Sequence, residues 1–99
     1  MSTIICDIDG VLCENNRVKY STKSPFKYHI DKLNKWYELG HRIELFTSRP
    51  SKGRKETEQW LEDNNVKHHK LIMDKPRGDI YIDDKGINSA KMGDLTLEI

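Results

Sequence analysis

The most constraining feature of this sequence is an apolar run that ends in two acidic residues. Residues 3–8 are mostly apolar and β-branched, and Asp7-Ile8-Asp9-Gly10 leads the run into a glycine turn. Such a run is typical of a strand buried in a parallel sheet. Ligands of open α/β sheets bind beyond the carboxyl ends of the strands. Because two carboxylates this close repel each other unless a cation or a shared proton compensates, Asp7 and Asp9 are candidate functional residues.

The rest of the chain alternates strands with helices. Ser24 and Pro25 predict a helix start, as the N-cap and first helical residue, and Gly40 predicts the helix end. The apolar residues of this helix recur at helical spacing: Phe26, Ile30, Leu33 and Tyr37. A second helix is expected at 51–64, where it buries Trp60 and Leu61, and a turn or short helix at 86–93. Further strands are expected at 41–47, 70–73 and 79–82, with an edge strand at 95–97.

This order of elements predicts an α/β fold: a single Rossmann-like three-layer domain over residues 1–99, with a mostly parallel sheet of about five strands. The polar segment 10–24 is irregular, and residues 18–20 could form a short strand that returns on 11–13. In such a sheet the carboxyl ends of the strands meet at one edge. The sequence therefore gathers Asp7, Asp9, Thr47 and the pair Asp83-Asp84 at the same rim.

Four elements in this order, Asp7-x-Asp9-Gly10, Thr47-Ser48-Arg49, Lys75 and Asp83-Asp84, resemble the motifs of the haloacid dehalogenase (HAD) superfamily of phosphohydrolases. The resemblance covers essentially the whole chain. Since neither insertion point of the superfamily offers room for a cap domain, the chain resembles small capless members. These include phosphatases linked to capsule or surface-sugar biosynthesis and polynucleotide 3′-phosphatases.

The resemblance implies a role for each motif residue. Asp7 would be the nucleophile that forms an aspartyl-phosphate, and Asp9 the general acid and base. Thr47 would donate its hydroxyl to the phosphoryl oxygens, and Lys75 would neutralise their charge. Lys70 and Arg77 are weaker alternatives to Lys75.

The resemblance also implies a magnesium site and substrate contacts. Mg²⁺, a hard cation that prefers oxygen ligands, would bind the Asp7 carboxylate, the Asp9 backbone carbonyl and an acidic side chain of the Asp83-Asp84 pair. Asp83 is favoured as the direct ligand, and Asp84 would either bind through water or orient the site. Gly10 would let the backbone turn beneath the phosphate. Ser48 and Arg49 would contact the substrate.

The charge balance bears on the partners. With 17 basic and 16 acidic residues the net charge is +1, so no global field favours nucleic acid or membrane. We therefore expect a small phosphorylated metabolite, such as a sugar phosphate, as the substrate. The alternatives are a polynucleotide 3′-phosphatase, a phosphoryl transferase or mutase, and a non-catalytic module that binds phosphate. In a capless protein, water exclusion would come from segment 10–24, a large substrate, or a homo-oligomer that supplies a cap surface.

The remaining residue types have simpler interpretations. Cys6 is expected in the core, and neither Cys6 nor Cys13 has the spacing of a zinc site. His68 and His69 are interpreted as surface or partly packed residues. With no apolar stretch long enough to span a membrane and no pattern typical of a signal peptide, a cytoplasmic location is expected.

Overall fold

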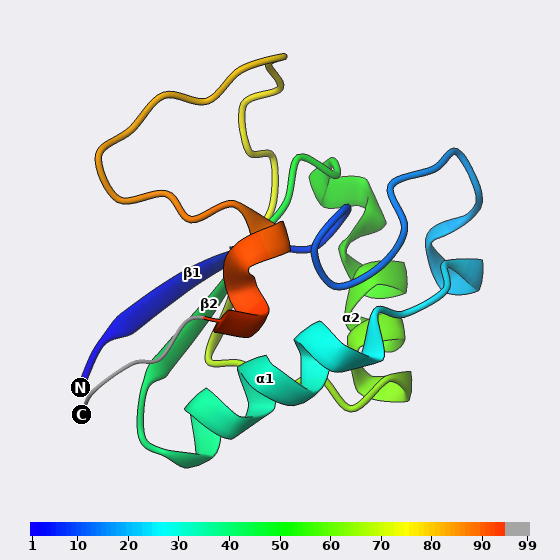
Figure 1. The fold of residues 1–99 in the computed structure, drawn as a ribbon. Coiled ribbons are helices and arrows are strands. Elements are labelled where there is room, and N and C mark those ends of the chain that lie inside the picture. The colour runs from blue at the N-terminus through cyan, green and yellow to red at the C-terminus, as the bar shows by residue number, and fades with distance from the viewer. Residues whose placement is uncertain (95–99) are drawn as a thin grey trace.

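A three-stranded parallel sheet organises the chain (Figure 1). In the computed structural model, which describes residues 1–94, the strands lie in the order β1-β2-β3. Their bounds are β1 (Thr3–Asp7), β2 (Arg42–Phe46) and β3 (Lys70–Ile72). The connections are α1 (Lys27–Glu38) and α2 (Arg54–Asp63), and three short 3₁₀ helices complete the set: η1 (Tyr20–Thr22), η2 (Ser51–Gly53) and η3 (Ser89–Asp94). The prediction of an α/β fold with a parallel sheet is confirmed.

The register of the sheet separates one buried face from one open face. Cys6 lies opposite Leu45, which lies opposite Leu71, and all three are buried. The next residues along the strands face the other way, and there Ile5 remains 63% exposed. Since both helical connections step in the same direction across the sheet, right-handed crossovers place α1 and α2 on one face. The described residues thus form two layers, so the expected third layer is absent from this part of the chain.

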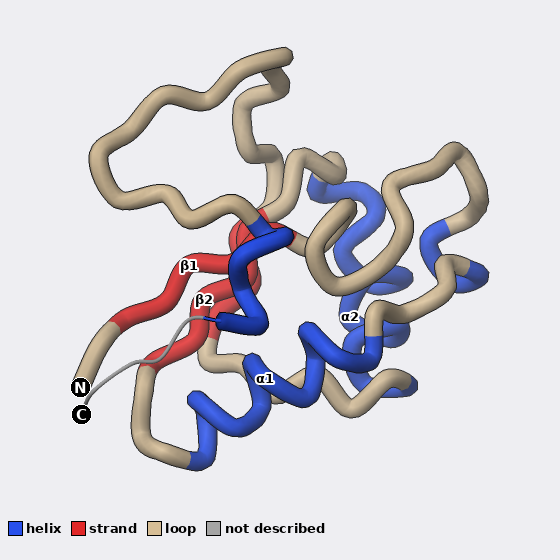
Figure 2. The backbone as a smooth tube through the Cα atoms, viewed as in Figure 1, coloured by secondary structure: helices blue, strands red, loops and turns tan. Residues whose placement is uncertain are grey.

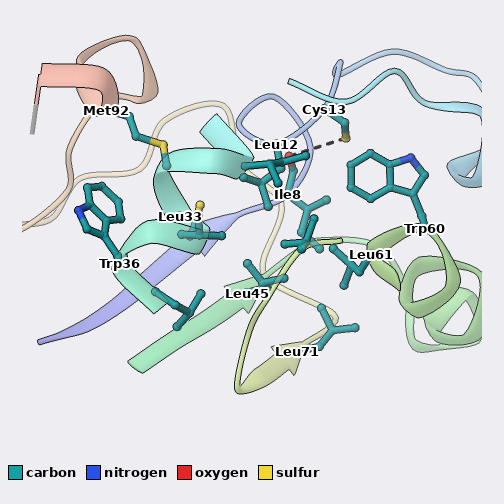
Figure 3. Packing of buried hydrophobic residues seen from close by; sticks show 14 of the residues in the cluster. Ile8, Leu12, Cys13, Leu33, Trp36, Leu45, Trp60, Leu61, Leu71 and Met92 are labelled. Atoms are coloured by element: carbon teal, nitrogen blue, oxygen red, sulfur yellow. Dashed lines mark hydrogen bonds between the residues drawn. The ribbon is translucent and has the colours of Figure 1, made fainter. Parts of the chain in front are cut away.

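One hydrophobic core joins the buried sheet face to both helices (Figure 3). Leu33 and Trp36 enter it from α1, Trp60 and Leu61 from α2, and Leu45 from β2. The turn after β1 contributes three further buried residues, which are Ile8, Leu12 and Cys13. Because Ile8 lies between the two acidic residues, its burial anchors the motif to the core. The predicted burial of Cys6, Trp60 and Leu61 is confirmed.

Helix α1 begins later than predicted. The backbone at Pro25 forms an antiparallel bridge to Cys13, and the amide of Phe26 donates to the carbonyl of Leu12 over 2.7 Å. These contacts hold residues 24–26 against residues 12–14, so Ser24 is not the N-cap and the helix starts at Lys27. Gly40, with φ +96°, ends the helix as predicted, since such a backbone conformation suits glycine.

Two other predicted boundaries or elements differ. Residues 51–53 form η2 before α2 begins at Arg54, so the second helix is shorter than predicted. Residues 20–22 form η1, and the predicted short strand at 18–20 is absent. The predicted edge strand at 95–97 lies outside the described residues.

The largest difference is the segment that follows β3. Residues 79–82, predicted as a strand, form part of a long loop that leaves the sheet and returns at η3 (Figures 1 and 2). Ile80 is 79% exposed and Ile82 is 92% exposed. The prediction was wrong for the single chain because this segment has no neighbouring strand there, and a strand needs the backbone hydrogen bonds of a neighbour. Three strands are formed among residues 1–94, and a five-stranded sheet is not confirmed.

Candidate functional site

The first motif lies in a tight turn directly after β1. Gly10 adopts φ +87° and its amide donates to the carbonyl of Cys13 over 2.9 Å, while Leu12 donates back to the carbonyl of Ile8. This conformation favours glycine, as the sequence predicted for position 10. The turn leaves Asp7 at the end of the strand and Asp9 two residues beyond it, on the rim where β2 also ends.

Lys75 meets Asp7 at this rim. Its Nζ donates to Asp7 Oδ2 over 2.5 Å and lies 4.2 Å from the centre of the Tyr81 ring. The backbone places it there, because the amide of Lys75 donates to the carbonyl of Thr47, just beyond β2. The Asp7 side chain remains partly open to solvent, whereas that of Lys75 is largely covered. Asp7 thus has a cation beside it and an open side from which a substrate can approach.

Asp9 is held much more tightly than Asp7. Arg49 Nε lies 2.9 Å from Asp9 Oδ2, and Arg49 Nη2 lies 2.8 Å from Asp9 Oδ1. Lys23 Nζ adds a second ion pair to Oδ1 over 3.0 Å. Burial raises the pKa of Asp9, but the hydrogen bonds and charges of Arg49, and then of Lys23, outweigh burial and hold this pKa below its ordinary value. Asp9 is therefore kept as a carboxylate.

Arg49 does not occupy the position that was expected from the sequence, in which its side chain would contact the substrate. The residue is only 2% exposed, and its guanidinium also donates to Thr57 Oγ1 over 3.1 Å and stacks on the Tyr20 ring at 4.0 Å. Because Arg49 follows closely after the end of β2, its side chain lies beside Asp9. In this arrangement Arg49 contacts the candidate acid-base residue, and the side chain does not reach into open solvent.

A polar pocket of about 210 Å³ lies over these residues. Five of the predicted site residues line it, namely Asp7, Asp9, Thr47, Ser48 and Lys75. Asn15, Arg77, Gly78 and Tyr81 complete the lining. Thr47 Oγ1 lies 3.4 Å from Asp9 Oδ2 and accepts a hydrogen bond from the amide of Arg49. A larger and more open hollow of about 480 Å³ lies over η2 and α2, but it contains none of the motif carboxylates.

Asp83 and Asp84 do not join this pocket. They lie on the exposed loop that replaces the predicted strand, where Asp83 Oδ1 accepts the amides of Lys85 and Gly86 over 2.7 and 2.5 Å. These hydrogen bonds lower the pKa of Asp83. The site as formed by one chain holds two carboxylates, one of them neutralised by two cations. No group of three His, Cys, Asp or Glu residues suited to a metal occurs among residues 1–94. The expected four-residue magnesium site is thus not assembled by these residues alone.

Sequence reasoning did not find three residues that the fold brings to the site. Lys23 is buried and forms an ion pair with Asp9, although it comes from a polar, irregular segment that is typical of a solvated loop. Asn15, in the same segment, and Tyr81 line the pocket. None of the three has a local sequence signal, since only the tertiary path of residues 10–24 and 75–81 brings them to the strand ends.

The comparisons with known proteins bear on the fold. Residues 4–91 match the family described as PITM 1-3, LNS2 domain. The chain belongs to this family. The LNS2 family supports a HAD-like phosphatase fold, which agrees with the resemblance found in the sequence but does not identify a subtype. No match was found among curated proteins.

Solved structures agree on the fold. A crystal structure of a protein from Vibrio cholerae is 23% identical, with a TM-score of 0.83 over 98% of this chain and 91% of that one. A chain of a Pnkp1/Rnl/Hen1 complex is 24% identical, with a TM-score of 0.68 over 79% of this chain and 30% of that one. A second structure, of the Pnkp1/Rnl/Hen1 RNA repair complex, is 24% identical, with a TM-score of 0.66 over 73% of this chain and 25% of that one.

The search for membrane-spanning helices found none among the described residues, since none of their helices has the length and apolar character that a span requires.

Proposed function

We propose that the protein is a phosphomonoesterase that uses Asp7 as a nucleophile. The observation that carries the proposal is the pairing of Asp7 with Lys75 in a polar pocket at the carboxyl end of β1. A carboxylate needs a cation beside it to approach an anionic phosphoryl group, and it needs an open side for in-line attack. Asp7 has both, whereas Asp9 is enclosed by Arg49 and Lys23.

The first step transfers the phosphoryl group to Asp7. An oxygen of Asp7 forms a bond to phosphorus, the bond from phosphorus to the ester oxygen breaks, and the leaving oxygen takes a proton. Lys75 neutralises charge on the phosphoryl oxygens, and Thr47 and Ser48 line the same pocket. Water then attacks phosphorus and releases inorganic phosphate and free Asp7.

Asp9 acts as the general acid in the first step and as the general base in the second. Its lowered pKa favours the carboxylate, which suits the second step, in which Asp9 removes a proton from the attacking water. To donate a proton in the first step, Asp9 must bind that proton more readily than it does in the free site. Bound substrate phosphate offers a cause, because it adds negative charge to the pocket that Asp9 lines.

The pocket favours a small substrate. A volume of about 210 Å³ is below the range of roughly 300–1,000 Å³ that holds drug-sized ligands. It suits a phosphoryl group with a small polar body, such as that of a sugar phosphate. Arg77 and Asn15 lie on the lining, where they can hydrogen-bond hydroxyl or phosphate oxygens.

The proposal includes a requirement for Mg²⁺, which would offset the charge of the substrate phosphate beside Asp7. Asp83 and Asp84 remain the proposed additional ligands, although they lie outside the pocket of the single chain. Removal of divalent cations with a chelator, followed by their return, tests the requirement directly.

A polynucleotide 3′-phosphatase is the second candidate, and one of the structures with the same fold is of the Pnkp1/Rnl/Hen1 RNA repair complex. Three cations lie just beyond β2, namely Lys52, Arg54 and Lys55, but Arg54 is engaged by Glu58 and by the carbonyl of Leu71. Binding of a nucleic acid would weaken steeply as salt rises, whereas binding of a small phosphate would weaken much less. A salt titration of the Michaelis constant for each substrate therefore distinguishes the two.

The test is phosphate release from an aryl phosphate and from a panel of sugar phosphates, nucleotides and 3′-phosphorylated DNA, with and without Mg²⁺. Asp7→Asn should lower turnover at least about a thousandfold. The matched control is Asp31→Asn, an acid-to-amide change on the exposed face of α1 that should keep wild-type turnover. A folded wild type that releases no phosphate from any substrate would favour the non-catalytic module.

A further inference from the structure

A buried ammonium group ties residues 14–24 to the candidate acid-base residue. Lys23 is 6% exposed, and its Nζ lies 3.0 Å from Asp9 Oδ1. The same Nζ donates to the carbonyl of Asn16 over 2.9 Å and to the carbonyl of Glu14 over 3.3 Å. Since a lysine ammonium has three N–H donors, these three acceptors use all of them. Two of the contacts therefore hold the backbone of the segment, and one holds the carboxylate.

Lys23 is itself held from outside the segment. The Trp60 side chain on α2 donates from Nε1 to the carbonyl of Lys23 over 2.9 Å, in the buried core. Residues 20–22 form η1, which lies beside α2 (Figure 1). There the Tyr20 ring packs so closely on Gly53 that a Cβ at this glycine would lie 2.8 Å from Tyr20 Cε2. The ammonium group thus acts from a fixed support, because α2 is part of the core.

The residue between the two held carbonyls is Asn15. It is exposed, and it lines the polar pocket together with Asp7 and Lys75. A Cβ at Gly10 would lie 3.6 Å from Asn15 Cβ and 3.8 Å from Asn15 Nδ2, so the Asn15 side chain lies against the turn of the first motif. Because the carbonyls on both sides of Asn15 are held, its amide group is already ordered before a ligand binds, and binding costs less entropy.

The chemistry of Asn15 differs from that of the cations in the pocket. A cation such as Lys75 attracts the phosphoryl group that every phosphate ester carries, so it does not distinguish one ester from another. The uncharged amide of Asn15 both donates and accepts hydrogen bonds, as a hydroxyl group does. A site that hydrogen-bonds a substrate hydroxyl discriminates against the analogue without it, because the polar group of the site then loses its partner.

We propose that Asn15 determines substrate specificity by hydrogen-bonding a hydroxyl group close to the phosphate ester, and that Lys23 is the residue that positions it. The hydroxyl lies close to the ester because Asn15 rests on Gly10, next to the motif carboxylates. The substrate class is then a phosphate ester of a polyol or sugar, and phosphate esters of simple alcohols are poor substrates. This inference rests on the proposed function and gives Lys23 a second role beside the neutralisation of Asp9.

The test compares two esters that differ only in hydroxyl groups, glycerol 1-phosphate and propyl phosphate. The wild type should have the higher kcat/KM for the glycerol ester, and Asn15→Ala should lower the ratio of the two values about tenfold, as for one neutral hydrogen bond. The matched control is Asn16→Ala, the same change at the next residue, which does not line the pocket and should keep the wild-type ratio. Phosphate release with the same ratio in wild type and Asn15→Ala would overturn the role of Asn15 and leave the proposed function standing.

Lys23→Met tests the positioning role. Loss of the contact with Asp9 lowers turnover of both esters by one factor and leaves their ratio unchanged, whereas release of the two carbonyls lowers the ratio itself. We expect Lys23→Met to have the ratio of Asn15→Ala, and the double variant to show no further decrease. A wild-type ratio in Lys23→Met, with folding checked by circular dichroism, would overturn the positioning role.

Binding measurements separate this inference from the proposed function. In Asp7→Asn the esters stay intact, so NMR titration gives their dissociation constants without turnover. The glycerol ester should bind more tightly than the propyl ester, and adding Asn15→Ala should reduce this preference about tenfold. Should Lys23→Met not fold, Lys23→Met/Asp9→Asn, which also removes the carboxylate that has lost a cation, should show the same reduced preference in binding. A wild type that releases no phosphate, with a binding preference that depends on Asn15, would contradict the proposed function and support the role of Asn15.

Discussion

Arg49 donates hydrogen bonds to both oxygens of the Asp9 carboxylate, with Nε 2.9 Å from Oδ2 and Nη2 2.8 Å from Oδ1. The guanidinium is held in turn by Thr57 and by the face of the Tyr20 ring. Two carboxylates that are two residues apart therefore have different surroundings. Asp9 is fixed by buried cations, whereas Asp7 meets one lysine and faces the pocket. The difference separates a proton-handling group from a nucleophile, because each role needs its own environment.

Removal of Arg49 should destabilise the fold. Arg49→Met leaves a partly buried carboxylate with one of its two cations, which should cost about 3 kcal/mol in the free energy of unfolding. Urea denaturation measures the loss. The loss of unfolding free energy in the double variant Arg49→Met/Asp9→Asn should be smaller than the sum of the losses in the two single variants, since both substitutions remove the same interaction. Strictly additive losses would show that the pair is energetically independent.

Removal of the Lys75 charge should impair turnover more than folding. Lys75→Met deletes the cation beside Asp7 while keeping an apolar chain against Tyr81 and Phe46. We expect turnover to fall by roughly 10²–10³, as for other groups that stabilise developing charge. Steady-state kinetics measures it, and Lys70→Met, at the opposite end of β3, is the matched control. Equal turnover in the two variants would contradict the role given to Lys75.

Stability should depend on the ionisation of Asp9. Its pKa is lower in the folded protein than in the unfolded one, so the contribution is complete above the unfolded value of about 4. The contribution is lost as the pH falls below 4 toward the folded pKa. The free energy of unfolding of the wild type should therefore decrease over this acid range more steeply than that of Asp9→Asn. Parallel slopes for the two proteins between pH 5 and pH 2, measured by urea denaturation, would contradict the shift.

The two thiols should react slowly in the folded protein. Burial, and then the Asp7 charge, raise the pKa of Cys6 to about 12, and burial, then the Asp9 charge, raise the pKa of Cys13 to about 11. At pH 8 the thiolate, which is the reactive form, is at least about a hundredfold scarcer than in an unperturbed cysteine. Alkylation followed by mass spectrometry should thus be slow without denaturant and fast in urea. Rapid labelling of either cysteine in the native state would indicate that its surroundings open.

Much of the site follows from local sequence patterns. Strand β1 could be predicted because an apolar β-branched run needs burial, and its acidic end could be placed at the rim because parallel strands share one direction. The same reasoning brought Thr47 close to Asp7 and Asp9, the family resemblance added Lys75, and the pocket contains all four. The glycine turn at position 10 also follows from the sequence, since its positive φ suits glycine.

Other features required the tertiary structure. Lys23 pairs with Asp9 only because residues 24–26 run alongside 12–14 and turn a polar segment inward. The pairing of residues 24–26 with residues 12–14 is also the reason why α1 begins later in the sequence than predicted. Neither outcome has a local signal, because each depends on a partner distant in the sequence.

The sequence by itself determined the strand-forming character of residues 79–82 and the acidic pair behind them. Only the tertiary structure decided that this segment projects from the single chain. The physical reason is that a strand is not a property of its own residues alone. It needs the backbone hydrogen bonds of a neighbouring strand, and among the described residues the segment 79–82 pairs with none.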